Sequence, residues 1–152
     1  ITKSHVIENK SKTFNIVINS AENEETLTGQ LRPKKYTSNI QHIALRTDDI
    51  FKLSKQIQDL GLETLKISDN YYDDIDAKFG LETSILEKIK KNNILYDEDN
   101  EGYFFQIYTT LINNSFFFEF VQRNQGYEGY GANNAIFRIS AQKKLIHGSH
   151  TW

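Results

Sequence analysis

The chain of 152 residues contains no cysteine and no methionine, and Pro33 is its only proline. The absence of cysteine excludes disulfide bonds, zinc–thiolate sites and thiol catalysis, and it fits a cytoplasmic location. No apolar run approaches the ~18 residues of a membrane span, and no signal-peptide pattern opens the chain. The net charge of −2 argues against a general binder of nucleic acid or membranes, because these polyanions would not attract it. Since Ile1 stands where a methionine would start a chain, we expect a processed or excised start.

The length suits one domain that buries roughly two-thirds of its unfolded surface. Two extended segments come first, residues 4–8 and 14–19, and the polar turn between them predicts a β-hairpin. Residues 20–39 are polar and contain the proline, which indicates a surface loop. An apolar strand and then a helix follow, the helix beginning after an Asp-Asp cap and stopping at a glycine, over residues 40–45 and 50–60.

The rest of the chain alternates between helical and extended patterns. A short strand is expected at 63–66, and residues 68–93 favour helices, with a capping-box sequence from Ser84 to Glu87. Three strands separated by Asn-, Asp- and Gly-containing turns are expected over residues 94–96, 103–110 and 116–122. The sequence therefore predicts an α+β fold with these parts: 1–19 as the last two strands of a truncated module, 20–39 as a surface loop, 40–123 as a complete βαβββ module with a helical insertion, and 124–152 as a C-terminal loop and tail.

His42 and Glu119 each lie in the middle of a strongly apolar extended run. A carboxylate buried among the phenylalanines around Glu119 costs several kcal/mol unless a cation, a proton or hydrogen-bond donors compensate it. Formation of a core does not require that cost, which indicates a site. A neutral imidazole and a carboxylate are two of the three side chains that hold ferrous iron in a 2-His-1-carboxylate triad. The two residues are therefore candidate metal ligands.

Alternation along the strands predicts which polar residues share a face. His42, the pair Gln106 and Tyr108, and Glu119 each lie on the mixed face of a strand whose other face is apolar and suited to packing under a helix. If the mixed faces point the same way, all four side chains line one concave surface. For any one of them alone, a hydrogen-bonded polar group of the core is the simpler interpretation, but their occurrence on three strands favours a site.

Several sequence blocks, in order and spacing, resemble the C-terminal half of 4-hydroxyphenylpyruvate dioxygenase, a member of the vicinal-oxygen-chelate superfamily. The most specific blocks are QHIAL at residues 41–45, QIY at 106–108 and FFEFVQR at 117–123, followed by Gly129-Tyr130-Gly131. The resemblance covers about residues 1–135. It implies a fold of paired βαβββ modules that curl around Fe(II).

The resemblance also implies roles for individual residues. His42 and Glu119 would be the second and third iron ligands, and the first, a histidine, would lie upstream of this chain. The implied reaction converts 4-hydroxyphenylpyruvate, an aromatic 2-oxo acid, and O2 to homogentisate and CO2 in tyrosine catabolism. Gln106 and Tyr108 would stand beside the reacting substrate as the catalytic pocket residues. The implied substrate-binding residues are Ser4, Asn19, Gln30, Gln106 and Tyr108.

The chain departs from the family pattern after Gly131. The family has an aromatic ring where this chain has Ala135, and Phe137 is the candidate that would supply the ring instead. Residues 138–152 are weakly patterned, so a gating helix is not expected there. The remaining histidines are expected on the surface and not at the metal: His5, His147 and His150.

Two alternatives stay open. Hydroxymandelate synthase has the same ligands and a different product, and the absence of a ring at Ala135 keeps this activity open. A non-catalytic module that binds a small molecule is the other alternative, since a shared fold does not fix a function. We expect the isolated chain to be inactive, because one ligand and half of the pocket would be absent. Assembly of the full-length protein into a homo-oligomer is also left open.

Overall fold

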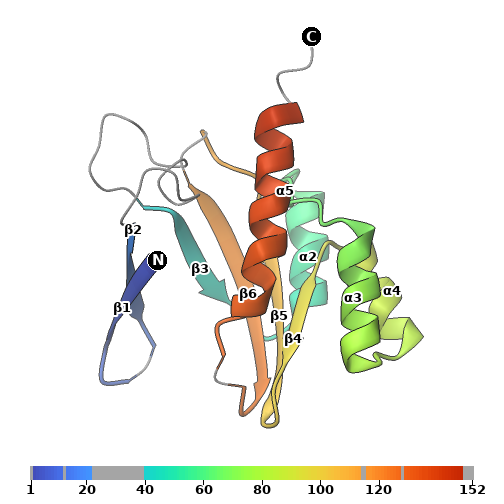
Figure 1. The fold of residues 1–152 in the computed structure, drawn as a ribbon, viewed down its shortest axis with the longest axis horizontal. Coiled ribbons are helices and arrows are strands. Elements are labelled where there is room, and N and C mark those ends of the chain that lie inside the picture. Colours follow the sequence, from blue (N-terminus) through green and yellow to red (C-terminus); the bar gives the residue numbers. More distant parts are fainter. Residues whose placement is uncertain (1, 12, 22–39, 114–115, 128, 149–152) are drawn as a thin grey trace. The chain divides into compact units, whose positions relative to one another are not determined.

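The computed structural model describes residues 2–11, 13–21, 40–113, 116–127 and 129–148. The chain divides into two compact units, residues 1–39 and 40–152, and each is described by itself. Figure 1 shows the elements of both units.

The first unit contains a β-hairpin. Strand β1 (Thr2–Glu8) pairs antiparallel with β2 (Asn15–Ala21). The turn is held by Asn9, whose side-chain oxygen accepts from the backbone N–H groups of Thr13 at 2.9 Å and Phe14 at 3.1 Å. The predicted hairpin is therefore confirmed. Most of the loop predicted over 20–39 lies outside the described residues.

A four-stranded sheet forms the centre of the second unit, in the order β3-β6-β5-β4. β3 runs parallel to β6, and the other neighbouring strands are antiparallel. Because β3 is followed by a helix and β4 to β6 come at the end of the unit, the order of elements is the predicted βαβββ order with a helical insertion. The strands are β3 (His42–Arg46), β4 (Leu95–Glu98), β5 (Gly102–Tyr108) and β6 (Phe117–Gln125).

Helix α2 (Ile50–Asp59) begins and ends as its sequence predicts. The Asp49 side chain accepts from the N–H of Lys52 at 2.9 Å, and Gly61 adopts a positive φ of 74° after the last turn. Its apolar side packs on the sheet, where the ring of Phe51 meets that of Phe105 edge-on at 5.6 Å. The sequence predicted that a helix would cover the whole of this apolar sheet face. That is wrong at β3, where Ile43 and Leu45 are 40% and 45% exposed.

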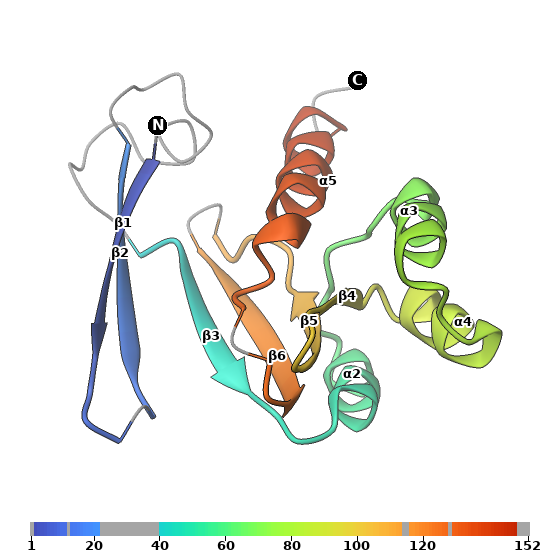
Figure 2. The same cartoon turned by 60° about the horizontal axis from the view of Figure 1, so that its bottom comes forward.

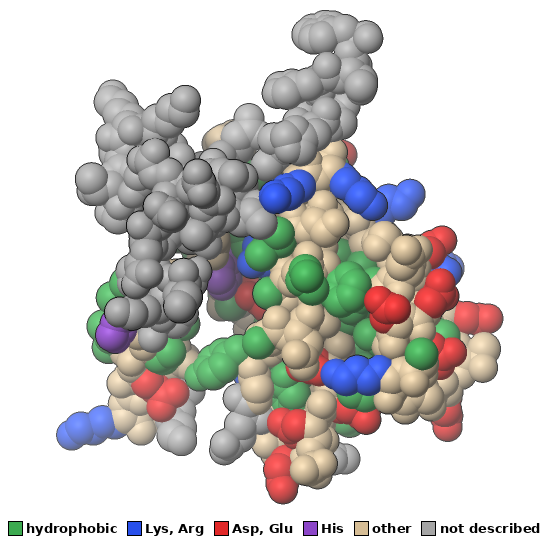
Figure 3. Space-filling view, viewed as in Figure 1, with side chains coloured by type: hydrophobic (Ala, Val, Ile, Leu, Met, Phe, Trp, Pro, Cys, Tyr) green, Lys and Arg blue, Asp and Glu red, His purple; other side chains and the backbone are tan. Residues whose placement is uncertain are grey.

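The insertion consists of two helices, α3 (Asp69–Phe79) and α4 (Thr83–Lys91), as expected for residues 68–93. The capping box predicted at Ser84 is wrong, because the N-cap of α4 is Glu82, two residues earlier, and it makes no side-chain hydrogen bond. The strand predicted at 63–66 is reduced to one isolated bridge, between Thr64 and Thr109. Acidic side chains gather over α3 in the space-filling view, which marks a solvated outer surface (Figure 3).

Helix α5 (Ala135–Gly148) follows the short 3-10 turn η1 (Ala132–Asn134). The prediction of a loop and tail without a helix after residue 124 is therefore wrong for this segment. The pattern was weak because the buried positions of the helix include Gln142 besides Ala141, so the inward side is not an apolar stripe. Figure 2 shows α5 and α2 on opposite sides of the sheet. Within the described ranges, the structure contains no helix both long and apolar enough to span a membrane.

Candidate metal site

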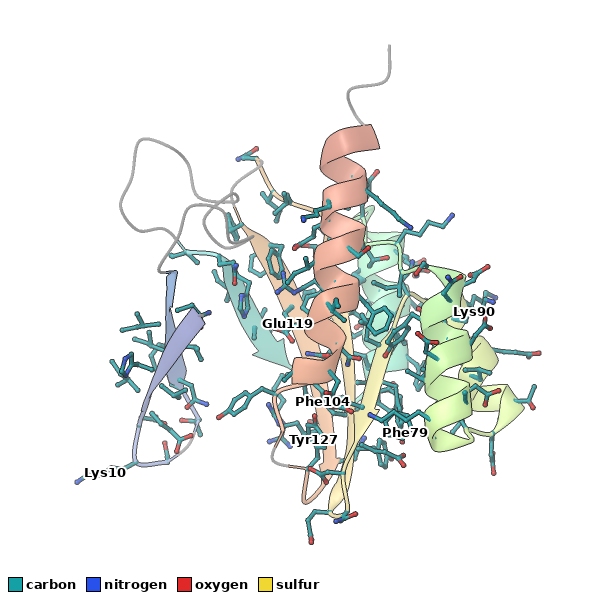
Figure 4. The ribbon with its side chains drawn as sticks, viewed as in Figure 1. Lys10, Phe79, Lys90, Phe104, Glu119 and Tyr127 are labelled. Atoms are coloured by element: carbon teal, nitrogen blue, oxygen red, sulfur yellow. The ribbon has the colours of Figure 1, made fainter. Side chains whose placement is uncertain are left out.

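The pairing of the strands brings the predicted polar side chains together on one face of the sheet. In the parallel pair, Ala44 of β3 is the register partner of Glu119, two residues after His42. In the antiparallel pair, Tyr108 is the register partner of Glu119. Because side chains alternate along each strand, His42, Gln106, Tyr108 and Glu119 lie on the same face. Figure 4 shows Glu119 on β6, the strand between β3 and β5.

Glu119 is the centre of this group. Its Oε2 lies 3.4 Å from Nε2 of His42, and its Oε1 accepts a hydrogen bond of 2.8 Å from Nε2 of Gln106. The same amide nitrogen donates to the hydroxyl oxygen of Tyr108 at 2.9 Å. Glu119 is only 8% exposed, so these contacts offset part of the cost of burying its carboxylate. Its Oε2 points toward the imidazole of His42.

His42 has the environment of a neutral imidazole. Its ring stacks on Phe117 with centroids 5.2 Å apart, and its Nδ1 is buried without a hydrogen-bond partner. Burial lowers the pKa of His42, the charge of Glu119 opposes that shift, and the charge of Arg138 adds to it. A neutral ring is the form that binds a metal ion. The imidazole is therefore prepared for a ligand role more than for a buried ion pair.

The donors present fit part of a ferrous site. Nitrogen and oxygen donors hold transition metals at about 2.0–2.2 Å, so a pair of atoms 3.4 Å apart can contact the same ion. In the part of the chain that the structure describes, there is no cluster of three or more His, Cys, Asp or Glu side chains able to hold a metal. The described residues thus offer two candidate donors for a metal ion and no third.

The Gly129–Gly131 loop and η1 contact the side chain of Gln106 and fix its orientation. Nδ2 of Asn134 donates to Oε1 of Gln106 at 2.7 Å, and Oδ1 of Asn134 accepts from the hydroxyl of Tyr71 at 3.0 Å. Both oxygen and nitrogen of the Gln106 amide are therefore fixed, which directs its N–H toward Glu119. A Cβ added at Gly131, where φ is 60°, would lie 2.6 Å from Nε2 of Gln106, so glycine is required for this approach.

A second hydrogen-bonded group anchors the same loop. The hydroxyl of Tyr127 donates to the buried carboxylate of Asp97 at 2.8 Å and accepts from the N–H of Gly131 at 3.1 Å. Burial and the bond to Asp97 raise the pKa of Tyr127 to about 12. Arg123 donates to the carbonyl oxygen of Gly129 and lies over the ring of Phe104, 4.6 Å from its centroid. The sequence did not predict these supporting contacts, and two of them, Tyr127 with Asp97 and Arg123 with Phe104, join residues far apart in the chain.

The other predicted site residues lie in the hairpin unit, outside the described residues, or on α5. Ser4 and Asn19 are register partners in the hairpin unit, and Gln30 lies outside the described residues. Phe137 packs edge-on against Tyr71 with centroids 4.8 Å apart and lines a cavity of about 190 Å³ beside Asp97. Their substrate-binding roles stay predictions. Among the other histidines, His5 is exposed, His147 falls within α5 and His150 lies outside the described residues.

No protein-family model matches the chain. Over 98% of its length it is 35% identical to a 3-dehydroshikimate dehydratase of Pseudomonas putida, of which it covers 24%. Over 62% of its length it is 37% identical to a 4-hydroxyphenylpyruvate dioxygenase of Tetrahymena thermophila, of which it covers 25%. The chain thus spans about a quarter of the length of both relatives.

Solved structures agree with these relatives. A fusion protein described as a xylose isomerase-like TIM barrel joined to 4-hydroxyphenylpyruvate dioxygenase matches with a TM-score of 0.81 and 35% identity, over 93% of this chain and 23% of that one. A mutant of 4-hydroxymandelate synthase from Streptomyces coelicolor matches with a TM-score of 0.74 and 22% identity, over 95% of this chain and 42% of that one. The chain therefore has the βαβββ fold of the vicinal-oxygen-chelate superfamily. Within it, the chain is similar to 4-hydroxyphenylpyruvate dioxygenases and to 3-dehydroshikimate dehydratases, and the resemblance that the sequence blocks indicated is confirmed.

Proposed function

We propose that this chain is the iron-binding module of a non-haem dioxygenase that acts on an aromatic 2-oxo acid. The observation that carries the proposal is the His42–Glu119 pair, with donor atoms 3.4 Å apart and the carboxylate oriented by Gln106. Packing of the core alone would not explain a buried carboxylate beside a neutral imidazole, because burying the charge costs free energy. Dioxygenases among the relatives support the same conclusion.

In this function, His42 and Glu119 hold Fe(II), and a third ligand comes from residues outside the described part of the chain. Bound iron would supply the activation of O2, a reaction that no side chain of this site can perform. Gln106 orients Glu119 by donating to Oε1, while the other carboxylate oxygen, Oε2, lies beside His42. Burial and then the charge of Glu119 hold the pKa of Tyr108 well above its usual range, so its hydroxyl stays protonated beside the substrate.

The specific reaction is proposed as the conversion of 4-hydroxyphenylpyruvate and O2 to homogentisate and CO2. The T. thermophila relative carries that enzyme's name, and it supports this choice. Hydroxymandelate formation is the alternative, supported by the shared fold of 4-hydroxymandelate synthase and by the small side chain of Ala135.

A second candidate follows from the 3-dehydroshikimate dehydratase and the fusion structure. Here the chain is part of the dioxygenase-like module of a fused dehydratase, and it binds metal or a small molecule without turnover. The second unit, a four-stranded sheet between helices, is not a TIM barrel, so a barrel-based activity would reside in another part of such a protein. The 35% identity to the dehydratase, which extends over 98% of this chain, favours this candidate.

The first test is ferrous titration of the full-length protein and of two variants, Glu119→Gln and His42→Ala, under anaerobic conditions. We expect each variant to bind iron more than about 100-fold more weakly, since loss of a ligand exceeds the 10–100-fold effect of losing an outer-shell partner. Glu101→Gln, which removes an exposed carboxylate, is the matched control and should bind as the wild type does. If Glu119→Gln and His42→Ala bind iron as tightly as the wild type and the control variant do, the proposed metal site is wrong.

Oxygen uptake with 4-hydroxyphenylpyruvate then separates the candidates. Homogentisate as product supports the first reaction and hydroxymandelate the alternative. Iron binding that depends on Glu119, without oxygen uptake, supports the fused binding module. In metal-free protein, Glu119→Gln should melt no lower than the wild type, because it removes a buried charge and retains the oxygen that accepts from Gln106. A lower melting temperature would instead assign Glu119 to a structural ion pair with His42.

A further inference from the structure

A cavity of about 190 Å³ is lined by residues of α3, β4, η1 and α5. Four aromatic rings line it, and they pack edge-on in two pairs: Tyr71 with Phe137 at 4.8 Å and Phe79 with Tyr96 at 5.5 Å between centroids. Figure 4 marks Phe79, one of these rings. Because an apolar cavity of about 150 Å³ can hold benzene, this cavity can hold a small ring. None of the four polar side chains gathered around Glu119 lines it.

The carboxylate of Asp97 forms the polar part of the cavity wall. The residue is 5% exposed, and its Oδ2 accepts a hydrogen bond of 2.8 Å from the hydroxyl of Tyr127. Its Oδ1 has only longer contacts among the described residues, with Nδ2 of Asn133 at 3.3 Å and with Nζ of Lys78 at 4.0 Å. A carboxylate can accept about four hydrogen bonds. Oδ1 can therefore accept a closer donor from a molecule in the cavity.

Lys78 indicates which kind of donor fits. Its ammonium group lies 4.3 Å from the ring centroid of Phe79 and 4.0 Å from Oδ1 of Asp97, so a cation already stands between a ring and the carboxylate. The side chain of Lys78 is 54% exposed, and so long a contact of an exposed lysine is weak. With Asp74, the charged residues of the lining are two carboxylates and one ammonium group. The lining thus favours a further positive charge over a negative one.

We infer that this cavity binds a small primary amine that carries an aromatic ring. The ring occupies the aromatic lining, and the ammonium group takes the place of Lys78 between Asp97 and Phe79, where a charge-assisted hydrogen bond and a cation–π contact hold it. Asn134 also lines the cavity and donates to Gln106 at 2.7 Å, so the amine lies beside a residue that fixes the metal-binding face. The inference does not depend on the proposed function. The competing explanation is a packing gap in which Lys78 only offsets the charge of Asp97.

The test compares benzylamine with benzyl alcohol, which share the ring and differ in the charged group. Their affinities for the full-length, metal-free protein at pH 7 are measured by isothermal titration calorimetry. We expect benzylamine to bind at least about tenfold more tightly, as for a hydrogen bond between charged groups. In Asp97→Asn this preference should fall to within about twofold. Asp76→Asn, at an exposed position of α3 outside the cavity lining, is the matched control and should retain the preference.

A variant of Lys78 tests the same site in the opposite direction. Lys78→Gln removes the competing ammonium group and should strengthen benzylamine binding about two- to fivefold, as for the loss of a weak surface ion pair. Lys88→Gln makes the same change of net charge at an exposed position outside the lining and should leave the affinity unchanged. Because Lys78 is exposed, this pair decides the question even if Asp97→Asn does not fold.

Three results would contradict the amine site: equal binding of both molecules by the wild type, a preference that persists in Asp97→Asn, or an affinity that Lys78→Gln does not raise. Glu119→Gln should bind benzylamine as the wild type does. Loss of benzylamine binding in that variant would place the amine at the metal-binding face and would also overturn the inference. A failure of the wild type to bind iron or to turn over substrate contradicts the proposed function alone.

Discussion

Gln106 joins three parts of the second unit through one amide group. It is 1% exposed and donates to Glu119 and Tyr108, while its oxygen accepts from Asn134 of η1. Gly131 packs directly against the amide, in a left-handed conformation with φ of 60°. The position of the Glu119 carboxylate therefore depends on a loop that is more than ten residues away in sequence and holds no ligand itself.

Replacement of Gly131 by alanine tests this dependence. The Gly131→Ala variant should be strained by its φ and by a clash with Gln106, whereas Gly80→Ala, at a φ of 62° with no atom within 4 Å of the added carbon, should be strained by φ alone. Each should lose about 1–2 kcal/mol for the left-handed conformation, and Gly131→Ala about 1–3 kcal/mol more for overpacking. Urea unfolding measures both. Equal losses in the two variants would show that Gln106 moves away freely.

The proximity of His42, Gln106 and Glu119 could be predicted from the sequence because it follows from local rules. Alternation of period two places His42, Gln106 and Glu119 on one face once the strands are recognised, and the apolar neighbours make the polar residues conspicuous. Arg138 could not be found in this way. It lies on α5, and its contacts with the rings of Phe117 and Tyr108 depend on tertiary packing that the pattern of one segment does not contain.

At the scale of elements, α2 and α5 show the same contrast. α2 has a capping aspartate, apolar residues at helical spacing and a terminal glycine, so its bounds follow from its own residues. α5 packs on the face that carries the site, and its inward side combines Phe137 and Ala141 with Arg138 and Gln142. A helix that covers a polar site cannot have a purely apolar inward face, which explains why this helix was not predicted.

The cap of α2 gives a direct test at this scale. Asp49→Ala should lower the free energy of unfolding by about 1 kcal/mol, because the N–H of Lys52 loses its acceptor. Asp48→Ala, in the adjacent exposed position, should change it by less than about 0.5 kcal/mol. Asp48 has only a weak surface contact with Arg46, at 3.9 Å. Equal effects on urea unfolding would show that charge near the helix, and not the capping bond, is what stabilises α2.

At the scale of the whole second unit, tyrosines take up much of the core. Most of their hydroxyl groups are hydrogen-bonded within the protein, as in the bond of 2.8 Å from Tyr127 to the carboxylate of Asp97, whereas the hydroxyl of Tyr72 is buried without a partner. Burial raises the pKa of each above the ordinary value of 10.0, with hydrogen bonds or nearby acidic groups adding to the shift in several of them: Tyr71, Tyr72, Tyr96, Tyr108 and Tyr127. The stability of the unit is thereby linked to keeping these hydroxyl groups protonated.

This linkage predicts alkaline unfolding. A group whose pKa is raised on folding stabilises the protein fully below its unfolded value, here 10.0, and that stabilisation is lost as the pH rises toward the folded value, about 12 for Tyr127. The melting temperature should therefore be constant up to about pH 10 and fall steeply above it, together with a cooperative rise in tyrosinate absorbance. Tyr127→Phe should melt lower at neutral pH, because Asp97 loses a hydrogen bond, and its alkaline fall should be shallower. A melting temperature that stays level above pH 10, or tyrosinate absorbance that rises before unfolding, would show that these hydroxyl groups titrate in the folded protein.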